Sequence, residues 1–545
     1  MTAYPAPPSK SSGLQRRHFL AASALPLIGC AKPGDIQGGF TGVNHERGHG
    51  LRDRTAWPAP SITRKTKVLI LGGGVAGLAA ARALRLKGQD DFALLELEDA
   101  AGGNSRGGVV NGIACPLGAH YLPVPGDDAH EVQDLLEELG LRQRVAGRWQ
   151  YDERHLCHSP QERLFFNGTW QDGLLPVQGL GPETLAQYQK FSQLIEQERQ
   201  AARWTMPASK QPLAPVQQAR AAITFATYLK QSGLTDPQLL WYLDYCCRDD
   251  FGAGITTVSA WAGIHYFASR HGFHAPGAES AEREGVLTWP EGNGWLTQRL
   301  TAPLQERLHT GRVVLRVANV NHGVEVDAFN TATQTVERWQ ASRAIVALPI
   351  FVAARVVQNA PDFLRQAAAH TVYAPWLVAN IHLNAALHDR PGAAPSWDNV
   401  LYGAPGLGYI DAMHQSLQPV PGATVLTYYR ALGDVPGGPS AGRRLLLDKP
   451  WGAWRDDILA ELAQAHPDLP AKTSRLDITR YGHAMAIPVP RNSSAISHPS
   501  TVFGRATSSN AKPITFKHES LTFAHSDWAG YSVFEEAFTL GHHAA

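Results

Sequence analysis

Three glycines with the spacing GxGxxG, at Gly72, Gly74 and Gly77, form the pattern in this sequence that points most clearly to chemistry. They follow directly after residues 68–71, a fully apolar run with the length of a buried strand. At this spacing the first glycine permits a tight turn, the second lets the backbone approach a pyrophosphate, and the third lets helix and strand pack closely. The pattern therefore predicts a turn that binds a dinucleotide.

The elements on both sides of this turn support that interpretation. Residues 78–87 have helical spacing, and the N-terminus of such a helix presents free N–H groups and the positive end of its dipole to phosphates. Residues 92–95 form a second apolar run that ends at Glu96, a carboxylate placed to accept hydrogen bonds from a ribose hydroxyl. Strand, turn, helix, strand and acid in this order predict a Rossmann-like unit.

The composition sets the broad class of the protein. With 545 residues, 44% of them hydrophobic and 18% charged, the chain is long enough for two or more globular domains. A formal net charge of +1 gives no reason to propose nucleic acid as a partner. We expect no metal site, because there is no CxxC pair and because His542 and His543, in an expected exposed tail, have no third ligand at suitable spacing. The cysteines expected to be buried thiols are Cys115, Cys157, Cys246 and Cys247.

An export signal is predicted over residues 1–30. Arg16 and Arg17 precede the apolar run 21–29, which is too short to span a bilayer, and the combination resembles a twin-arginine signal. The residues just before Cys30 resemble a bacterial lipobox, which implies cleavage before this cysteine and a lipid on its thiol. The alternative is an ordinary signal with a chance cysteine.

These signals predict a bacterial periplasmic protein that contacts the membrane only through a lipid anchor at Cys30. Twin-arginine export carries folded chains, as a noncovalent cofactor loaded in the cytoplasm requires. Residues 31–64 are rich in Gly, Pro, Arg and His without an apolar period, and we interpret them as a tether.

A second glycine-containing segment, shortly after Glu96, favours FAD over NAD. Gly102, Gly103, Asn104 and Arg106 lie in a stretch that resembles the second glycine motif of the flavin-containing amine oxidase superfamily. That superfamily includes monoamine and polyamine oxidases, carotenoid desaturases and protoporphyrinogen oxidase. Its usual form is Gly-Gly-Arg, and here Asn104 replaces the arginine, so Arg106 is the candidate to supply the charge at the phosphates.

Later segments resemble the same superfamily in the same order. Residues 115–121 resemble its loop that carries backbone against the flavin, and residues 289–296 resemble its turn into a helix. Residues 313–326 and 344–349 resemble the β-hairpin and return strand that close over the adenine. Asn319 lies nearest that contact, within one residue either way.

The C-terminal segment completes the resemblance. In the family an acid at the Asp527 position contacts the phosphate–ribityl region, and a helix from about Val533 points its N-terminus at the flavin pyrimidine, where it stabilises negative charge. The residues implied to bind the cofactor are Gly72, Gly74, Val75, Ala76, Gly77, Glu96, Gly102, Gly103, Asn104, Arg106, Gly118, Ala119, His120, Asn319, Asp527 and Val533.

Together these matches imply an α/β fold of the amine oxidase type. A Rossmann-like FAD-binding domain is assembled from three separate segments, 65–125, 285–349 and 480–545. An inserted α+β substrate domain takes residues 126–284 and 350–479. No cysteine follows position 247, so the C-terminal thioether that some family members make to flavin is not available, and we expect noncovalent FAD.

Catalytic residues stay unassigned, with three candidates on the substrate side. His483 suits proton transfer near neutral pH, and Trp376 and Tyr531 suit an aromatic slot for a cation, although a structural role is the alternative for each. The charged run 248–250 is either a substrate entrance or a solvated helix end.

The resemblance implies an exported FAD-dependent oxidoreductase that oxidises an amine or similar small molecule by hydride transfer to flavin N5. Many amine oxidases hold a water beside N5 with a lysine, but residues 373–383 contain none, and Val378 is nearest that position. This favours a quinone or protein as the electron acceptor. Two alternatives stay open: a flavin dehydrogenase or desaturase acting on a C–C bond, and a flavin-binding partner protein without turnover.

Overall fold

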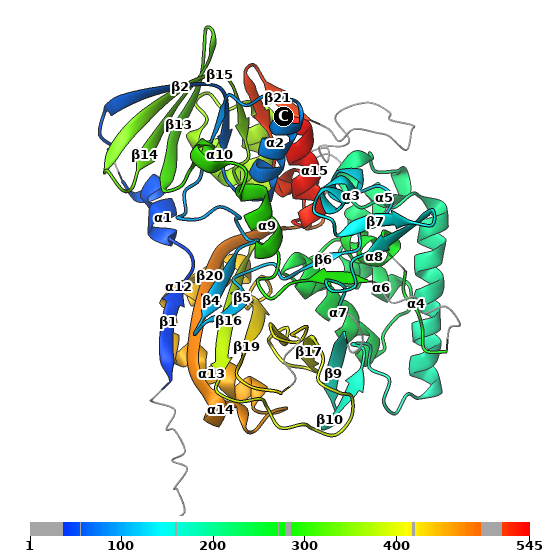
Figure 1. Ribbon diagram of the computed structural model, residues 1–545. Coiled ribbons are helices and arrows are strands. Elements are labelled where there is room, and N and C mark those ends of the chain that lie inside the picture. The colour runs from blue at the N-terminus through cyan, green and yellow to red at the C-terminus, as the bar shows by residue number, and fades with distance from the viewer. Residues whose placement is uncertain are drawn as a thin grey trace, which may run out of the picture.

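Two large sheets and a helical layer make up the protein, and the predicted α/β fold is confirmed (Figure 1). The computed structural model describes residues 36–54, 56–157, 161–270, 272–277, 285–416, 420–491 and 515–545. The predicted export signal and Cys30 lie outside these residues.

The first sheet contains the strands that flank the glycine turn. Their order is β12-β3-β2-β15-β14-β13, and β22 pairs with both β15 and β21. Strand β2 runs parallel to β3 and β15, whereas β13, β14 and β15 form an antiparallel meander. The bounds are β2 Pro60–Leu71, β3 Phe92–Leu95, β12 Leu308–His309, β13 Arg312–Val320, β14 Gly323–Asn330, β15 Thr335–Val346, β21 Phe516–His518 and β22 Leu521–Phe523.

Helices cover both faces of this sheet. On one face, α2, α3, α9 and α15 bury apolar side chains against Val68, Ile70 and Leu94. On the other face, α10 and α11 pack against Leu69 and Leu71. Successive residues of a strand point to opposite faces, and because helices cover both faces here, residues 68–71 of β2 are all apolar. The helices are α2 Val75–Leu86, α3 His130–Glu138, α9 Gly294–Thr301, α10 Ile350–Val356, α11 Asp362–His370 and α15 Phe534–Ala544.

The second sheet has the order β1-β20-β16-β19-β18-β17-β9-β10. Strand β16 runs antiparallel to both β19 and β20, and β1 runs parallel to β20 at the edge. The bounds are β1 Gln37–Thr41, β9 Glu162–Phe166, β10 Thr169–Asp172, β16 Val372–Leu383, β17 Asp398–Leu401, β18 Tyr409–Asp411, β19 Thr424–Ala431 and β20 Thr473–Ile487.

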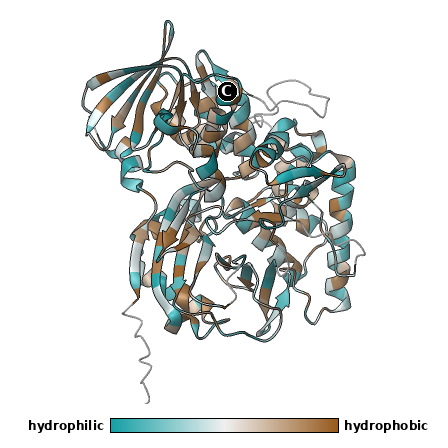
Figure 2. Ribbon diagram, in the orientation of Figure 1, coloured by the Kyte–Doolittle hydropathy of each residue, from teal (hydrophilic) through white to brown (hydrophobic). Residues whose placement is uncertain are grey.

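Side chains of β16 point alternately to its two faces, which decides which of them reach the interior between the sheets. Leu377 and Ala379 pack against α12 (Gly438–Asp448) and α13 (Trp451–Leu462), with α14 (Leu469–Lys472) next in the chain. Trp376 and Val378 point to the opposite face. Figure 2 shows the same alternation as changing hydropathy along the strands of both sheets.

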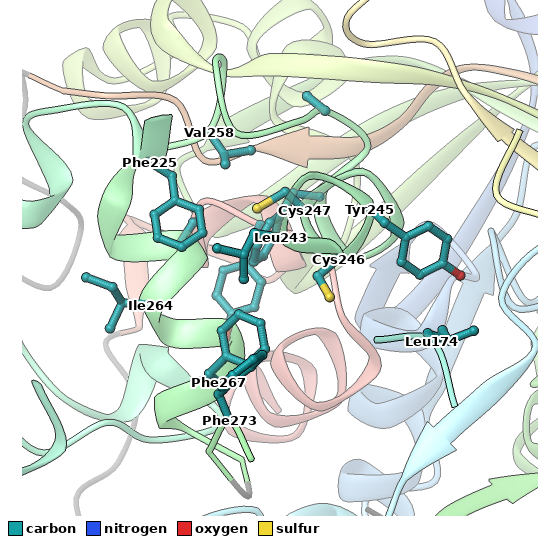
Figure 3. Packing of buried hydrophobic residues seen from close by; sticks show 14 of the residues in the cluster. Leu174, Phe225, Leu243, Tyr245, Cys246, Cys247, Val258, Ile264, Phe267 and Phe273 are labelled. Atoms are coloured by element: carbon teal, nitrogen blue, oxygen red, sulfur yellow. The ribbon is translucent and has the colours of Figure 1, made fainter. Parts of the chain in front are cut away.

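A helical layer packs against the second sheet's other side (Figure 1). Its apolar core includes Phe225, Leu243, Ile264 and both adjacent cysteines (Figure 3). The cysteines at 115, 157, 246 and 247 are free and buried, as predicted. The helices are α4 Pro182–Ala201, α5 Pro215–Ala221, α6 Phe225–Gln231, α7 Pro237–Phe251 and α8 Ala260–Ala268.

Short elements complete the chain. They are α1 His45–Asp53, β4 Gly107–Val110, β5 Ile113–Pro116, β6 Tyr121–Pro123, β7 Arg142–Val145, β8 Arg148–Tyr151, β11 Val286–Thr288 and the 3₁₀ turns η2 Ala208–Lys210, η3 Gln305–Arg307 and η5 Ser526–Ala529. Among the residues that the structure describes, no helix is both long and apolar enough to cross a membrane.

Three predictions about chain organisation are wrong in part. The tether over 31–64 instead contains β1, α1 and the start of β2, because main-chain pairing with β20 orders a segment that has no apolar period. Residues 480–487 belong to β20 of the second sheet rather than to the FAD-binding sheet. The expected exposed tail is the end of α15, where His543 Nε2 lies 2.6 Å from Glu131 Oε1.

Candidate active site

One cavity of about 460 Å³ lies between the two sheets, and we call it the central cavity. The glycine turn after β2, the second glycine segment, the start of α15 and strand β16 all contribute to its wall. The predicted cofactor residues that line it are Gly72, Gly74, Val75, Ala76, Glu96, Gly102, Gly103, Asn104, Gly118, Ala119, His120, Asp527 and Val533.

The glycine turn is held tightly against the first sheet. Gly77 does not line the central cavity, because it packs helix against strand: a Cβ there would lie 1.9 Å from the carbonyl oxygen of Gly72. Glu96 is buried, and its Oε2 accepts a 2.6 Å hydrogen bond from the N–H of Gly73. Its Oε1 accepts a 2.8 Å bond from the N–H of Glu98. Burial raises the pKa of Glu96, and these two bonds act against that rise.

The second glycine segment meets the first turn across the cavity wall. The N–H of Gly102 donates to the carbonyl of Gly73 at 2.7 Å, and a Cβ on Gly103 would lie 3.1 Å from the Cα of Gly74. Gly103 also has φ +59°, a conformation that side chains disfavour. The two backbones therefore leave a narrow cradle that side chains would fill, which suits a pyrophosphate.

Arg106 is not at the cavity, so the prediction that it replaces the missing family arginine is wrong. Its Nε donates to the carbonyl of Gly103 at 3.2 Å and its guanidinium to the carbonyl of Gly42. The side chain therefore supports the loop from behind. Asn104 does line the cavity, and its side-chain amide donates to the carbonyl of Ala484.

Asn319 is also away from the cavity, and its Oδ1 accepts from the N–H of Ser520 at 3.3 Å. The β13 residues that line the cavity are Arg312 and Val314. A strand advances about 3.3 Å per residue, so Asn319 lies about 17 Å along the strand from Val314. The hairpin prediction placed the contact too far along β13.

The C-terminal segment brings a buried acid and a helix start to the cavity. Asp527 Oδ2 accepts from the N–H of Ile350 at 3.0 Å and from the hydroxyl of Tyr373 at 2.6 Å. Burial acts to raise the pKa of Asp527, but His525 and these two donors hold it below its usual value. Helix α15 begins at Phe534, and Val533, Phe534 and Ala537 line the cavity.

Two of the three substrate-side candidates reach the cavity. Trp376 lines its wall from β16, and His483 lies at an exposed position with its ring 4.6 Å from that of Phe351. Tyr531 is fully buried elsewhere and its hydroxyl donates to Glu536 Oε1 at 2.7 Å, so the prediction that it lines an aromatic slot is wrong.

Other aromatic side chains form the slot instead. The rings of His120 and Tyr429 lie 4.4 Å apart, and both residues line the cavity with Tyr121. Burial lowers the pKa of His120 to about 3, so its imidazole is neutral at physiological pH. Val378 lines the cavity as well, and no lysine is found among the described residues of its wall.

Acidic groups of the substrate part also form cavity wall. Asp249 and Asp250, at the end of α7, line it with Arg270. Asp250 Oδ1 accepts from Arg270 at 3.0 Å, whereas its Oδ2 is buried and has no hydrogen-bond partner among the described residues. The charged run 248–250 was interpreted as either a substrate entrance or a solvated helix end. Because Asp249 and Asp250 line the cavity, the structure favours the substrate entrance.

The charge balance at these acids is unfavourable for anions. Burial, then repulsion from Asp250, raises the pKa of Asp249 to about 7. Burial, followed by repulsion from Asp249 and Glu162, raises the pKa of Asp398 well above its usual value. A cation bound nearby would favour the ionised form of such carboxyls.

Several residues of the cavity wall were not among the predicted site residues. Asn293 is 1% exposed, its amide nitrogen donates to the carbonyl of Tyr121 at 2.8 Å, and its Oδ1 has no partner among the described residues. It lies within the segment that resembles the family's turn into a helix, which could have pointed to it. Tyr429 and Arg270 stand in no motif, and only the tertiary structure brings them to the cavity.

The wall therefore fits a flavin dinucleotide in three respects. The glycine cradle admits a pyrophosphate, the buried Glu96 suits a ribose, and the start of α15 offers main-chain N–H groups. The described residues contain no group of three His, Cys, Asp or Glu side chains that could hold a metal ion.

Comparisons with solved structures show that other proteins share this fold. The chain is similar in structure to putrescine oxidase bound to putrescine, with 16% identity, a TM-score of 0.61 and coverage of 88% of this chain and 98% of that one. It is also similar to cyclohexylamine oxidase from Brevibacterium oxydans IH-35A, with 17% identity, a TM-score of 0.60 and the same coverage. A fatty acid isomerase from P. acnes follows with 13% identity, a TM-score of 0.56 and coverage of 88% and 97%.

Sequence comparison supplies the family. A Baeyer-Villiger monooxygenase from Pseudomonas aeruginosa is 36% identical over 77 residues, and the match spans only 14% of each chain. The family model for flavin-containing amine oxidoreductases matches residues 75–545. The protein therefore belongs to the flavin-containing amine oxidoreductase family and is a FAD-dependent oxidoreductase.

Proposed function

We propose that the protein oxidises a small amine that carries a second cationic group. The observation that carries this proposal is the pair Asp249 and Asp250 in the wall of the same cavity that contains the glycine cradle. Asp250 pairs with Arg270, whereas Asp249 has no ion-pair partner among the described side chains, so its carboxylate is left to attract a cation.

The aromatic wall supports the same substrate class. The ring centroids of His120 and Tyr429 lie 4.4 Å apart with their planes tilted by 32°, and Trp376 lines the same cavity. Aromatic faces attract ammonium groups and pack against the alkyl chain between them. Because His120 is neutral, it adds no positive charge that would repel the substrate.

A bound flavin supplies the acceptor for the hydride that leaves the carbon next to nitrogen. The protein's contribution is to exclude water and to orient the substrate. The apolar residues Val378 and Trp376 exclude water, and the acids at the end of α7 orient the cationic substrate. The start of α15 offers main-chain N–H groups that would stabilise negative charge on a bound flavin ring.

The test is anaerobic mixing of the purified protein with diamines, monoamines and uncharged apolar compounds. Bleaching of the flavin absorbance by diamines, and more slowly by monoamines of the same length, is the expected result. If no amine bleaches the flavin, the proposal fails.

A second candidate is a dehydrogenase or desaturase that acts on a C–C bond. Val378 lines the cavity and is the residue nearest in sequence to the position where many amine oxidases have a lysine, which favours this candidate. Bleaching by an uncharged apolar donor alone would select this candidate. Bleaching by no donor would favour a flavin-binding partner protein without turnover. Whether the donor is an amine or a compound with a C–C bond to oxidise, we propose a quinone or a protein as the electron acceptor.

We propose that the FAD is held noncovalently. Cys246 and Cys247 lie in the apolar helical core and do not line the central cavity (Figure 3). Burial raises the pKa of Cys115 and Cys157 to about 12, which disfavours their thiolates. Denaturation in acid should release all of the flavin into the supernatant. Flavin that stays with the precipitated protein would contradict this proposal.

We also propose export to the bacterial periplasm with a lipid anchor at Cys30, which the twin arginines Arg16 and Arg17 and the lipobox support. Membrane fractionation of the wild type and a Cys30→Ser variant tests it. The wild type should be found with membranes and the variant in the soluble periplasmic fraction.

A further inference from the structure

The N-terminal segment 36–54, which we call the strap, lies outside the region that the family model matches. It begins at the edge of the second sheet, where β1 pairs with β20 from Gln37↔Arg475 to Thr41↔Thr479. It then crosses to the first sheet as helix α1 (Figure 1). One short segment thus contacts both parts of the protein that form the central cavity.

The strap binds the loop that follows the cavity's buried acid. The main-chain N–H of Asn44 donates to Glu98 Oε1 at 3.0 Å, and its side-chain amide donates to Glu98 Oε2 at 2.8 Å. Arg47 donates to the carbonyl of Leu97 at 3.0 Å and pairs with Asp99 at 2.8 Å. Three groups of this three-residue loop, the carboxylates of Glu98 and Asp99 and the carbonyl of Leu97, are therefore bonded to two residues of the strap.

The loop in turn positions the ribose-binding acid. The N–H of Glu98 donates to Glu96 Oε1 at 2.8 Å, on the side of the carboxylate opposite to the bond from Gly73. A chain of hydrogen bonds thus runs from Asn44 through Glu98 to Glu96. Movement of the strap would release one of the two donors that orient the acid.

The strap also contributes directly to the cavity wall. Leu51 of α1 lines the cavity, as do Leu97, Arg312 and Val314. Its carbonyl accepts a 2.8 Å hydrogen bond from Arg355 Nε of helix α10, which holds this turn of α1 in place. Glu96 marks the ribose end of the cavity, so Leu51 closes the end where the adenosine half of a dinucleotide would lie.

Polar bonds hold most of the strap, and its core packing is limited to the buried Ile36 and the partly buried Val43 and Leu51. Helix α1 contains no buried residue, and four of the five residues of β1 are exposed. A segment attached in this way can open without unfolding the sheets, since local opening depends on local contacts. Retention of a ligand beneath it then depends on the bonds at Asn44 and Arg47.

We propose that the strap is a clasp for the adenosine half of the flavin dinucleotide, which it retains by fixing the 97–99 loop and by covering the cavity with Leu51. This inference rests on noncovalent flavin binding, and it goes beyond the proposed reaction because it concerns retention of the cofactor. The clasp slows cofactor loss whatever donor the enzyme oxidises.

The test compares flavin release from an Asn44→Ala/Arg47→Ala double variant and from the wild type. Release is followed by the rise of free-flavin fluorescence after dilution. We expect about tenfold to hundredfold faster release, because hydrogen bonds to charged groups are lost. The matched control is Arg52→Ala on the same helix, whose side chain pairs only with the exposed Asp53 among the described residues. The control should release flavin at the wild-type rate.

A second measurement separates a clasp from general destabilisation. The Tm of the flavin-free double variant should equal that of the flavin-free wild type, while the rise in Tm on adding FAD should be smaller. A Leu51→Ala variant, which keeps the polar bonds, should release flavin a few-fold faster. Wild-type release from both variants would overturn the clasp, as would an equal loss of Tm with and without FAD. A failed donor screen would leave this result unaffected, so the two proposals can fail separately.

Discussion

Replacing Asp249 by asparagine should selectively weaken the oxidation of diamines. The carboxyl lines the central cavity and carries charge that an amide lacks. Two unit charges about 4 Å apart attract by about 4 kcal/mol at an effective dielectric constant of about 20, and by about 1 kcal/mol in water. A cavity wall lies between these limits, so we expect a loss of about 2 kcal/mol, or about 30-fold in kcat/KM.

The pH dependence of kcat/KM gives this prediction a distinct signature. Burial and the neighbouring Asp250 raise the pKa of Asp249 to about 7, so the group is ionised above that pH and neutral below it. The ratio of kcat/KM for a diamine to that for a monoamine should therefore rise as the pH rises through about 7, since kcat/KM reports groups of the free enzyme. The Asp249→Asn variant should show a flat ratio.

Steady-state assays with a diamine and a monoamine of equal chain length measure the effect. Asp362→Asn is the matched control, because this acid is exposed on α11 and its side chain is 79% accessible. Equal losses for the two substrates, or an unchanged pH profile in Asp249→Asn, would refute the reasoning.

Three further predictions concern stability and cofactor binding. Asp249→Asn should raise Tm at about pH 8 but not at about pH 4. The folded pKa of Asp249, about 7, lies above its pKa in the unfolded chain, so the wild-type protein loses stability as the pH rises between these two values. An unchanged Tm at both pH values would contradict this. Gly77→Ala should lower the flavin content severely, since its Cβ would lie 1.9 Å from the carbonyl of Gly72, whereas Gly39→Ala, with no heavy atom within 4 Å, should retain full flavin absorbance. Tyr373→Phe should cost about 1–3 kcal/mol in urea unfolding, because the buried Asp527 loses a 2.6 Å donor; an unchanged midpoint would show that another group replaces the hydroxyl.

The parts of the site that the sequence predicted are those in which neighbouring residues determine one another's geometry. The glycine turn and Glu96 belong to this class, because the tight turn, the helix start and the acid at a strand end follow from backbone sterics within one βαβ unit. Trp376 and His483, predicted from the aromatic and proton-transfer chemistry of their side chains, also line the cavity.

The errors have a common physical cause. Arg106 and Tyr531 each bond to a partner that the local pattern does not reveal: Arg106 donates to the strap, and Tyr531 donates to a buried glutamate of α15. Asn319 was misplaced because register along a strand depends on its pairing, and a few residues amount to many ångströms. The strap was taken for a tether because main-chain pairing requires no apolar pattern.

The sequence by itself thus determined the cofactor class, the family and the Rossmann-like unit, since contiguous residues specify the geometry of that unit. Only the tertiary structure decided which carboxyls share the cavity with the cofactor site and which segment covers it. Asp249 and the glycine cradle lie far apart in the chain, and the raised pKa of Asp249 arises first from its burial in the folded protein and then from repulsion by Asp250. Such burial and charge depend on long-range packing, which no local pattern of residues encodes.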